Sequence, residues 1–207
     1  MKDKRIEWID VAKAIGIIIV LAYHACPDGY FKNMMWQMHM PLFAFLSGIV
    51  YKEEYSLNFQ KVRIFIVKKI EKLYIPFEAY SLFFLLLHNF FYKINFIGEI
   101  NGNKILSGGG YVKQFVLILT LGGGESLTGA LWYLIPLFEL EIIFAVLLCL
   151  FKRIKKDKEC NCVVAVIVAF IYILFSNLNL PRNLSNASRL ILFYSAGYFY
   201  KKYNVLE

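Results

Sequence analysis

This sequence has few charged residues, and its cysteines form no recognisable pairs. Charged residues make up 18% of its 207 residues, whereas 59% are hydrophobic and the mean hydropathy is +0.55. Soluble domains usually have about 45–50% apolar residues, so an ordinary water-soluble domain is excluded. The four cysteines form no C-x-x-C pair and are too sparse for a disulfide scaffold, so we expect free thiols and no metal site.

A cleavable N-terminal leader is not evident either. The first apolar stretch contains Asp10 and Lys13 and is followed by no clear small-residue cleavage site. We therefore expect this stretch to remain in the mature protein. No repeat, low-complexity tract or soluble domain is visible, so residues 1–207 are expected to form a single membrane domain.

Six apolar runs approach the length of about 20 residues that an α-helix needs to cross a bilayer. They are Trp8–Ala25, Met34–Tyr51, Leu73–Tyr92, Leu131–Phe151, Cys162–Ser176 and Ala187–Tyr200. A seventh run, Tyr111–Leu121, is too short to span and is interpreted as an interfacial or re-entrant piece. The prediction is an all-α, polytopic membrane helix bundle with about six transmembrane helices.

The basic residues predict the orientation of this bundle, since short cytoplasmic loops retain lysine and arginine. With six spans, sixteen of the 23 basic residues fall on one side and six on the other, and Lys13 is left inside a helix. We therefore predict that both termini are cytoplasmic. The net charge of +8 is thus interpreted as a topology signal, and no nucleic-acid partner is expected.

Ionisable groups inside membrane helices usually face the bundle interior, and the first predicted helix contains three of them. Asp10 and Lys13 are three residues apart and can pair near the cytoplasmic boundary. His24 follows Lys13 by eleven residues, so both side chains project from one stripe about 16 Å apart along the axis. Gly16 and Val20 lie beside that stripe and would leave room for a thin ligand. Histidine is the commonest general base, although a lone histidine is often only a hydrogen-bonded core residue.

The second predicted helix contributes His39, which would lie near the outer end of the bundle and share a cavity with His24. Pro41 is expected in the first turn of this helix, where proline is tolerated. Ser47 and Gly48 are small, and we interpret them as a seam at which another helix approaches closely, in preference to a site with Ser47 as nucleophile.

A basic segment that contains Lys68, Lys69 and Lys72 precedes the third predicted helix. Such a cluster either meets anionic lipid headgroups at the inner membrane surface or holds the phosphates of a cytoplasmic cofactor. Composition alone favours lipid.

Carboxylates within the helices form the last set of candidates, because a carboxylate at such depth needs a partner. Glu78 lies one turn inside the third predicted helix, and Glu139 and Glu141 follow the start of the fourth. At most one of Glu139 and Glu141 can face a given cavity. Either is interpreted as a group that orients a histidine or as a structural hydrogen-bond partner.

Four short motifs occur in order along the chain. They are Ile9-Asp10-Val11-Ala12-Lys13 followed by His24, Met38-His39-Met40-Pro41-Leu42-Phe43 leading to Ser47-Gly48, Lys69-Ile70-Glu71-Lys72-Leu73 leading to Pro76, and Leu131-Trp132-Tyr133-Leu134-Ile135-Pro136. Together they resemble the acyltransferase 3 family of bacterial membrane acyltransferases. The first motif fits the family's pattern of a basic residue, ten residues and a histidine, and the resemblance rests on the joint order of all four.

The resemblance implies an O-acyltransferase of the bacterial cytoplasmic membrane. Such an enzyme moves an acyl group, usually acetyl, from cytoplasmic acetyl-CoA to a hydroxyl of a surface sugar or polysaccharide. Carried over to this sequence, it implies that His24 is the catalytic base, that Lys13 is its basic partner, and that Lys69 and Lys72 bind the CoA phosphates. To these we add further candidates, namely His39 and Glu78 for catalysis and Lys68 for the phosphates.

Two features depart from the family pattern. Arginine commonly stands where this chain has Lys13 and Lys72, and lysine lacks the bidentate grip of a guanidinium on phosphate or carboxylate. Family members also usually continue for several more helices. We therefore expect a chain truncated at its C-terminus, with membrane lipid around it and with a second chain as the source of the missing helices.

Two other functions stay open. A transporter or binding protein for an ion or small solute would line its path with Lys13, Glu78, Glu139 and the histidines, although no inverted repeat is visible. An inactive remnant of an acyltransferase would still insert into the membrane.

Overall fold

The structure is a computed structural model that describes residues 6–94, 105–120, 126–154, 157–181 and 183–203. Within these residues the chain is all-helical and contains no strand. The α-helices are α1 (Glu7–Ala25), α2 (Tyr30–Ile49), α3 (Phe59–Lys69), α4 (Ile75–Lys93), α5 (Gly108–Leu119), α6 (Leu134–Lys152), α7 (Asp157–Phe175) and α8 (Leu184–Tyr203). Shorter helical turns are η1 (Glu53–Ser56) and η4 (Ser126–Tyr133), both 3₁₀, and η2 (Ile70–Tyr74), which is a π-helix.

All six predicted apolar runs are helical, with ends shifted by five residues or fewer. They correspond to α1, α2, α4, α6, α7 and α8, and the short seventh run corresponds to α5. Two stretches, Glu7–Ala25 and Leu131–Lys152, are long and apolar enough to cross a membrane, and Glu159–Phe175 is a shorter apolar helix. The all-α prediction is thus confirmed for the described residues.

Helix α3 was not predicted from the sequence, because four of its eleven residues are basic and the segment lacks a long apolar run. One face of the helix is nevertheless apolar and buries Val62 and Phe65. The side chain of Asn58 caps the N-terminus by accepting a hydrogen bond of 2.9 Å from the Lys61 backbone N–H. From there the chain runs through η2 directly into α4, so α3 positions the lysines near the base of α4.

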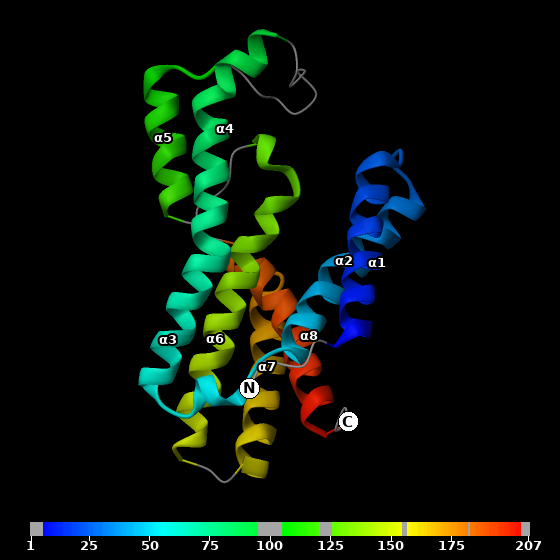
Figure 1. Ribbon diagram of the computed structural model, residues 1–207, viewed down its shortest axis with the longest axis vertical. Helices are drawn as coiled ribbons and strands as arrows, with labels where there is room; N and C mark the ends of the chain where they lie inside the picture. Colours follow the sequence, from blue (N-terminus) through cyan, green and yellow to red (C-terminus); the bar gives the residue numbers. More distant parts are fainter. Residues whose placement is uncertain (1–5, 95–104, 121–125, 155–156, 182, 204–207) are drawn as a thin grey trace.

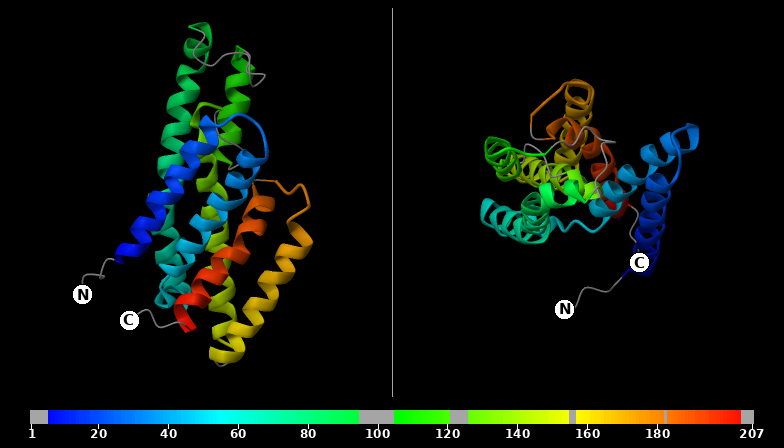
Figure 2. Two further views of the ribbon diagram at one scale, coloured as in Figure 1. Left: turned by 90° about the vertical axis from the view of Figure 1, so that its right-hand side faces the viewer. Right: turned by 90° about the horizontal axis from the view of Figure 1, so that it is seen from above.

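The start of α1 and the end of α8 lie at the same end of the bundle (Figures 1 and 2). This end also carries α3 and the C-terminal ends of α2, α6 and α8, with their lysines, and we call it the basic end. At the opposite end, α4 and α5 form a helical pair that projects beyond the other helices (Figure 1). The connection between α1 and α2 also lies at that opposite end. The separation of basic residues expected from the sequence therefore has a counterpart in the fold.

Two glycines allow α2 and α8 to cross closely. A Cβ atom on Gly48 would collide with the backbone carbonyl of Tyr194, and one on Gly197 would collide with that of Phe45. Small residues let helix backbones approach in this way within membranes. The predicted seam at Ser47 and Gly48 is confirmed, and Gly48 is the residue that the crossing requires.

The core between α2, α6 and α8 is aromatic. The side chains of Phe144, Tyr194 and Tyr198 are almost fully buried. The ring centroid of Phe144 lies 5.1 Å from that of Tyr194 and 5.2 Å from that of Tyr198, in edge-to-face arrangements that aromatic pairs favour. These aromatic contacts fix α6 relative to α8.

Pro41 lies in the middle of α2, and its expected place in the first turn is wrong. The helix begins at Tyr30, before the apolar run that served to locate it. Proline has no backbone N–H, so the carbonyl of Gln37, four residues earlier, loses its helical hydrogen bond. The carbonyl of Met40, the residue before Pro41, accepts a hydrogen bond of 3.0 Å from the Tyr133 hydroxyl, which links this part of α2 to the start of α6.

Candidate active site

The structure brings two histidines together at the end of the bundle opposite the basic end. His24 occupies the last turn of α1, and His39 lies in α2. The ring of Tyr23 contacts both, because its centroid lies 5.0 Å from the His24 ring and 5.4 Å from the His39 ring. We call this end the histidine end.

His39 is fully buried and has one ring nitrogen in use. Its Nδ1–H donates a hydrogen bond of 2.5 Å to the backbone carbonyl of Met35, one helical turn earlier. This bond requires a proton on Nδ1, so Nε2 is the nitrogen that carries the lone pair whenever the ring is neutral. Nε2 is buried without a hydrogen-bond partner among the described residues. An imidazole held at one nitrogen, with the other free to accept, is the arrangement that acid–base chemistry requires.

His24 and Lys13 lie eleven residues apart on α1, and His24 is exposed whereas Lys13 is half-buried. Gly16, between them, faces α2. A Cβ atom there would lie 2.8 Å from the Phe43 ring and 3.3 Å from Leu42. The room expected beside Gly16 is therefore filled by α2 side chains, and the predicted passage at this position is wrong. The glycine serves the packing of α1 on α2.

Lys32, in the first turn of α2, also contacts the Tyr23 ring. The Lys32 ammonium lies 5.4 Å from the centroid of the Tyr23 ring and 2.8 Å from the Asp28 carboxylate. The hydrogen bond from Lys32 and its charge hold the pKa of Asp28 below the usual range. A charged pair thus lies close to the histidines at the histidine end.

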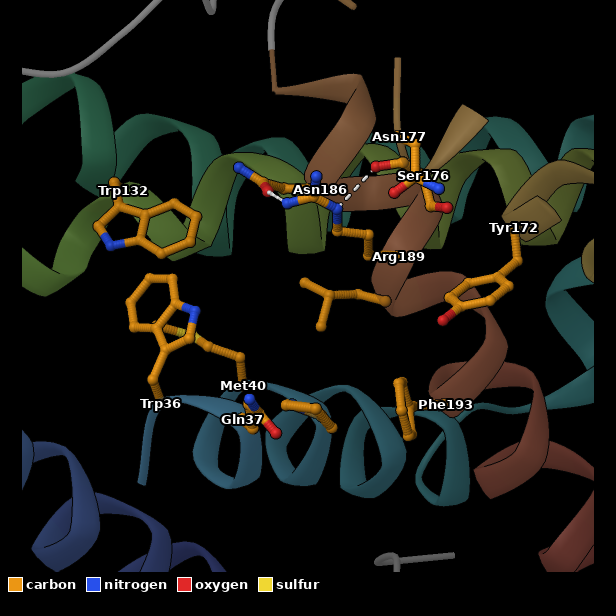
Figure 3. Close-up of a pocket in the computed structure, with 12 residues that line it drawn as sticks. Trp36, Gln37, Met40, Trp132, Tyr172, Ser176, Asn177, Asn186, Arg189 and Phe193 are labelled. Atoms are coloured by element: carbon orange, nitrogen blue, oxygen red, sulfur yellow. Dashed lines mark hydrogen bonds between the residues drawn. The ribbon is translucent and has the colours of Figure 1, made fainter. Parts of the chain in front are cut away.

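Aromatic side chains continue from the histidines toward α6. The Trp36 ring lies 5.7 Å from the His39 ring and stacks on Trp132, with centroids 5.6 Å apart and an interplanar angle of 24°. Both indoles line a pocket of about 400 Å³, which we call the tryptophan pocket (Figure 3). Its walls come from α2, η4, the end of α7 with the turn after it, and α8. Its lining residues are Trp36, Gln37, Met40, Pro41, Trp132, Tyr172, Ser176, Asn177, Asn186, Arg189, Leu190 and Phe193.

This pocket was not predicted from the sequence. Trp132 was named only as part of a motif, and Arg189 was not singled out among the basic residues. A signal was present nevertheless. Arg189 lies inside the predicted apolar run Ala187–Tyr200, where a charge by default marks a functional site.

The three predicted phosphate-binding lysines have different surroundings at the basic end. Lys69 Nζ lies 2.7 Å from Glu141 Oε1, and the Glu141 side chain is only 2% exposed. Lys68 Nζ donates to the Tyr55 hydroxyl at 3.0 Å. Lys72 is exposed within η2. Lys69 therefore already has an anionic partner, whereas Lys72 is open to a ligand in solution.

Glu78 lies near the start of α4 and is 8% exposed. Its polar neighbour is the hydroxyl of Tyr74, and no hydrogen bond joins its carboxylate to His24 or His39. Glu139 is also buried, and Glu141 pairs with Lys69. In the described part of the chain, the histidine pair thus has aromatic neighbours and a backbone carbonyl as its fixed contacts.

Across the described residues, these features define an all-helical protein with two helices long and apolar enough to cross a membrane, two neighbouring imidazoles beside a pocket at one end, and lysines at the other. A family model, described as an acyltransferase domain of the acyltransferase 3 type, matches residues 6–207. The chain therefore belongs to the acyltransferase 3 family, a family of membrane acyltransferases. No curated protein and no solved structure matches the chain.

Proposed function

We propose that this protein transfers an acyl group, in the simplest case acetyl, from acetyl-CoA to a hydroxyl of a carbohydrate. The observation that carries the proposal is the pair of imidazoles around Tyr23, with the unpaired Nε2 of buried His39 one ring away from the tryptophan pocket. The pocket's volume of about 400 Å³ lies within the range of small-molecule sites, which is about 300–1,000 Å³.

In this mechanism His24 is the general base, because it is the exposed member of the pair and the member that the family motif supplies. One of its ring nitrogens takes the proton of the acceptor hydroxyl while the hydroxyl oxygen attacks the thioester carbonyl. The C–S bond then breaks, and the CoA thiolate leaves and recovers a proton from the imidazolium. His39, held by the Met35 carbonyl, acts as a positioning residue, because its ring packs on the Tyr23 ring that also contacts His24.

The donor is proposed to enter at the basic end. Lys72 and Lys68 would pair with the CoA phosphates, since Lys72 is exposed and the hydroxyl of Tyr55 leaves the charge of Lys68 uncompensated. Lys69 would join them only by leaving Glu141. Lys13, half-buried on α1, is proposed as a cationic group between the two ends. The Glu78 carboxylate is retained as a candidate that would act after a rearrangement.

We further propose six membrane crossings in a bacterial cytoplasmic membrane, with the basic end in the cytoplasm. Support comes from the two long apolar helices, from the common end shared by α1 and α8, and from the basic residues gathered there. Thiol labelling from either side tests this orientation. Cys162 on α7 is exposed near the basic end and should react first from the cytoplasmic side.

Replacement of His24 by alanine tests the assigned base. We expect thioester consumption in proteoliposomes that contain acetyl-CoA and an acceptor glycan to fall by about 10²–10⁴-fold, the usual contribution of a general base. The matched control is His88→Gln, which alters the remaining histidine on α4. Equal activity of His24→Ala and the wild type, at equal abundance, would eliminate His24 as the base. Solute uptake without thioester consumption would instead support a transporter.

Replacement of Lys72 by alanine tests the donor site. We expect a rise of about tenfold in KM for acetyl-CoA with little change in kcat, because a charge-assisted contact to phosphate is lost from binding alone. Lys61→Ala is the control, since it removes an equally exposed charge from α3. An identical small effect of both variants would assign the cluster to lipid binding.

A further inference from the structure

The tryptophan pocket contains a cation without an anion of its own. None of the described residues that line it is an aspartate or glutamate. Arg189 supplies the charge, and its Nε donates a hydrogen bond of 2.7 Å to the carbonyl of Ser176. Its Nη1 faces Asn186 Oδ1 at 3.5 Å. Figure 3 shows the guanidinium held between these two groups along one wall of the pocket.

These two contacts use neutral acceptors, and a guanidinium has five N–H donors in a planar fork. Donors therefore remain for a further partner, and the fork is already oriented by the carbonyl of Ser176 and the side chain of Asn186. A pre-positioned guanidinium is the group that proteins use to bind carboxylate or phosphate in a bidentate manner. The charge also lies in the second turn of α8, near the positive end of the helix dipole.

The rest of the pocket suits a sugar ring. Trp36 and Trp132 stack on each other and together form an apolar aromatic part of the pocket wall, against which the C–H face of a pyranose can pack. Gln37 and Asn177 line the pocket with amide groups, which can both donate to and accept from hydroxyls.

We propose that the tryptophan pocket binds an acceptor saccharide that carries an anionic group, such as a uronic acid, with Arg189 paired to the anion and the ring stacked on the tryptophans. The inference rests on the proposed function for its link to catalysis. That link is Trp36, whose ring lines the pocket and lies 5.7 Å from the ring of His39. Arg189 is thus a specificity-determining residue that acts on substrate binding.

Equilibrium binding in the absence of any acyl donor tests the pocket alone. The full chain, in a Trp8→Phe background and in phosphatidylcholine nanodiscs, retains Trp36 and Trp132 as its two tryptophans, so its fluorescence reports on the pocket. The probes are methyl glucuronide and methyl glucoside. The glucuronide carries a carboxylate where the glucoside has a neutral hydroxymethyl group. We expect the glucuronide to bind about tenfold more tightly, the size of one good charge-assisted contact.

Arg189→Gln should raise the Kd for the glucuronide by about tenfold and leave the Kd for the glucoside unchanged. Arg189→Lys should keep part of the preference, since it keeps the charge without the fork. Arg153→Gln, at the basic end, is the matched control and should change neither Kd. If Arg189→Gln does not fold, salt serves instead, because high ionic strength should weaken only glucuronide binding to the wild type.

Three results would overturn the proposal. They are equal affinity for the two probes, loss of both probes in Arg189→Gln, and tighter Arg189-dependent binding of glycerol 3-phosphate, which would identify a lipid-headgroup site. The test is separate from that of the proposed function. His24→Ala should lose acyl transfer and still bind the glucuronide more tightly than the glucoside. An active enzyme that binds the two probes equally would contradict the anionic acceptor and leave the proposed acyl transfer intact.

Discussion

The ion pair between Lys69 and Glu141 decides whether Lys69 is available to a phosphate. Glu141 is 2% exposed, and the ammonium of Lys69 lies 2.7 Å from it. Removing one partner of a buried ion pair leaves the other charge buried and uncompensated, which lowers the free energy of unfolding by about 3–5 kcal/mol. A CoA phosphate would therefore have to replace this interaction with an equally good one.

Lys69→Met is accordingly expected to lower the free energy of unfolding by about 3–5 kcal/mol, because the Glu141 carboxylate loses its partner. The double variant Lys69→Met with Glu141→Leu should recover most of that loss. Denaturant unfolding in detergent, arranged as a double-mutant cycle, measures both. A Lys69→Met protein that keeps its stability and only binds acetyl-CoA more weakly would show that Lys69 belongs to the donor site.

The two partners of this pair illustrate what single residues reveal before a fold is known. Lys69 was recognisable from its motif, and Glu141 from its depth in an apolar run. Their contact joins residues separated by 72 positions along the chain, and no local pattern encodes it. Charge and depth therefore identified the candidates, whereas the partner of each was set by packing of η2 and α3 on α6.

At the scale of elements, the crossing of α2 and α8 is the most exacting contact. We expect Gly48→Ala to lower the free energy of unfolding by about 3 kcal/mol, because the added methyl group collides with the Tyr194 carbonyl and the helices must separate. Reaction of the buried thiols of Cys149 and Cys160 during heating measures unfolding.

Gly109→Ala is the control for this variant, since a Cβ atom there meets nothing within 4 Å and alanine favours a helix. Its stability should be unchanged or slightly raised. Equal unfolding temperatures for Gly48→Ala and the wild type would mean that the two backbones are not as close as the structure has them.

Hydrophobic runs located the helices well, because a run of apolar residues between basic clusters leaves few alternatives. The same criterion overlooked α3, whose apolar face is only one side of a charged helix. It also misplaced Pro41, since the first turns of α2 are too polar to belong to the run. The elements that were missed are thus those in which a polar sequence is helical for tertiary reasons.

At the scale of the whole molecule, the candidate site could be predicted only in part. The motifs pointed to His24 and His39, and α1 and α2 are consecutive helices joined by a short turn, so their meeting follows from the sequence. The tryptophan pocket unites α2 with η4, α7 and α8. Trp36 and Trp132 stack across almost a hundred residues, and only the packed bundle places them together.

At the basic end, one carboxylate connects η1 to α6 and α8. Glu53 in η1 lies 3.3 Å from Lys152 on α6 and 2.5 Å from Lys202 on α8, and it accepts a hydrogen bond from the Tyr198 hydroxyl. Burial alone would raise the pKa of Glu53, but the hydrogen bonds from Lys202 and Tyr198 and the nearby positive charges lower it to about 2.

Because the pKa of Glu53 is lower in the folded protein than its ordinary value of 4.5, its stabilising effect is complete above pH 4.5. The effect disappears as the pH falls toward 2. We therefore expect the unfolding temperature of the wild type to drop more steeply between these values than that of Glu53→Gln, which lacks the titrating group. Glu54→Gln, one residue further along η1 and exposed, should follow the wild type. Parallel curves for Glu53→Gln and the wild type would show that this carboxylate does not hold α6 and α8 together.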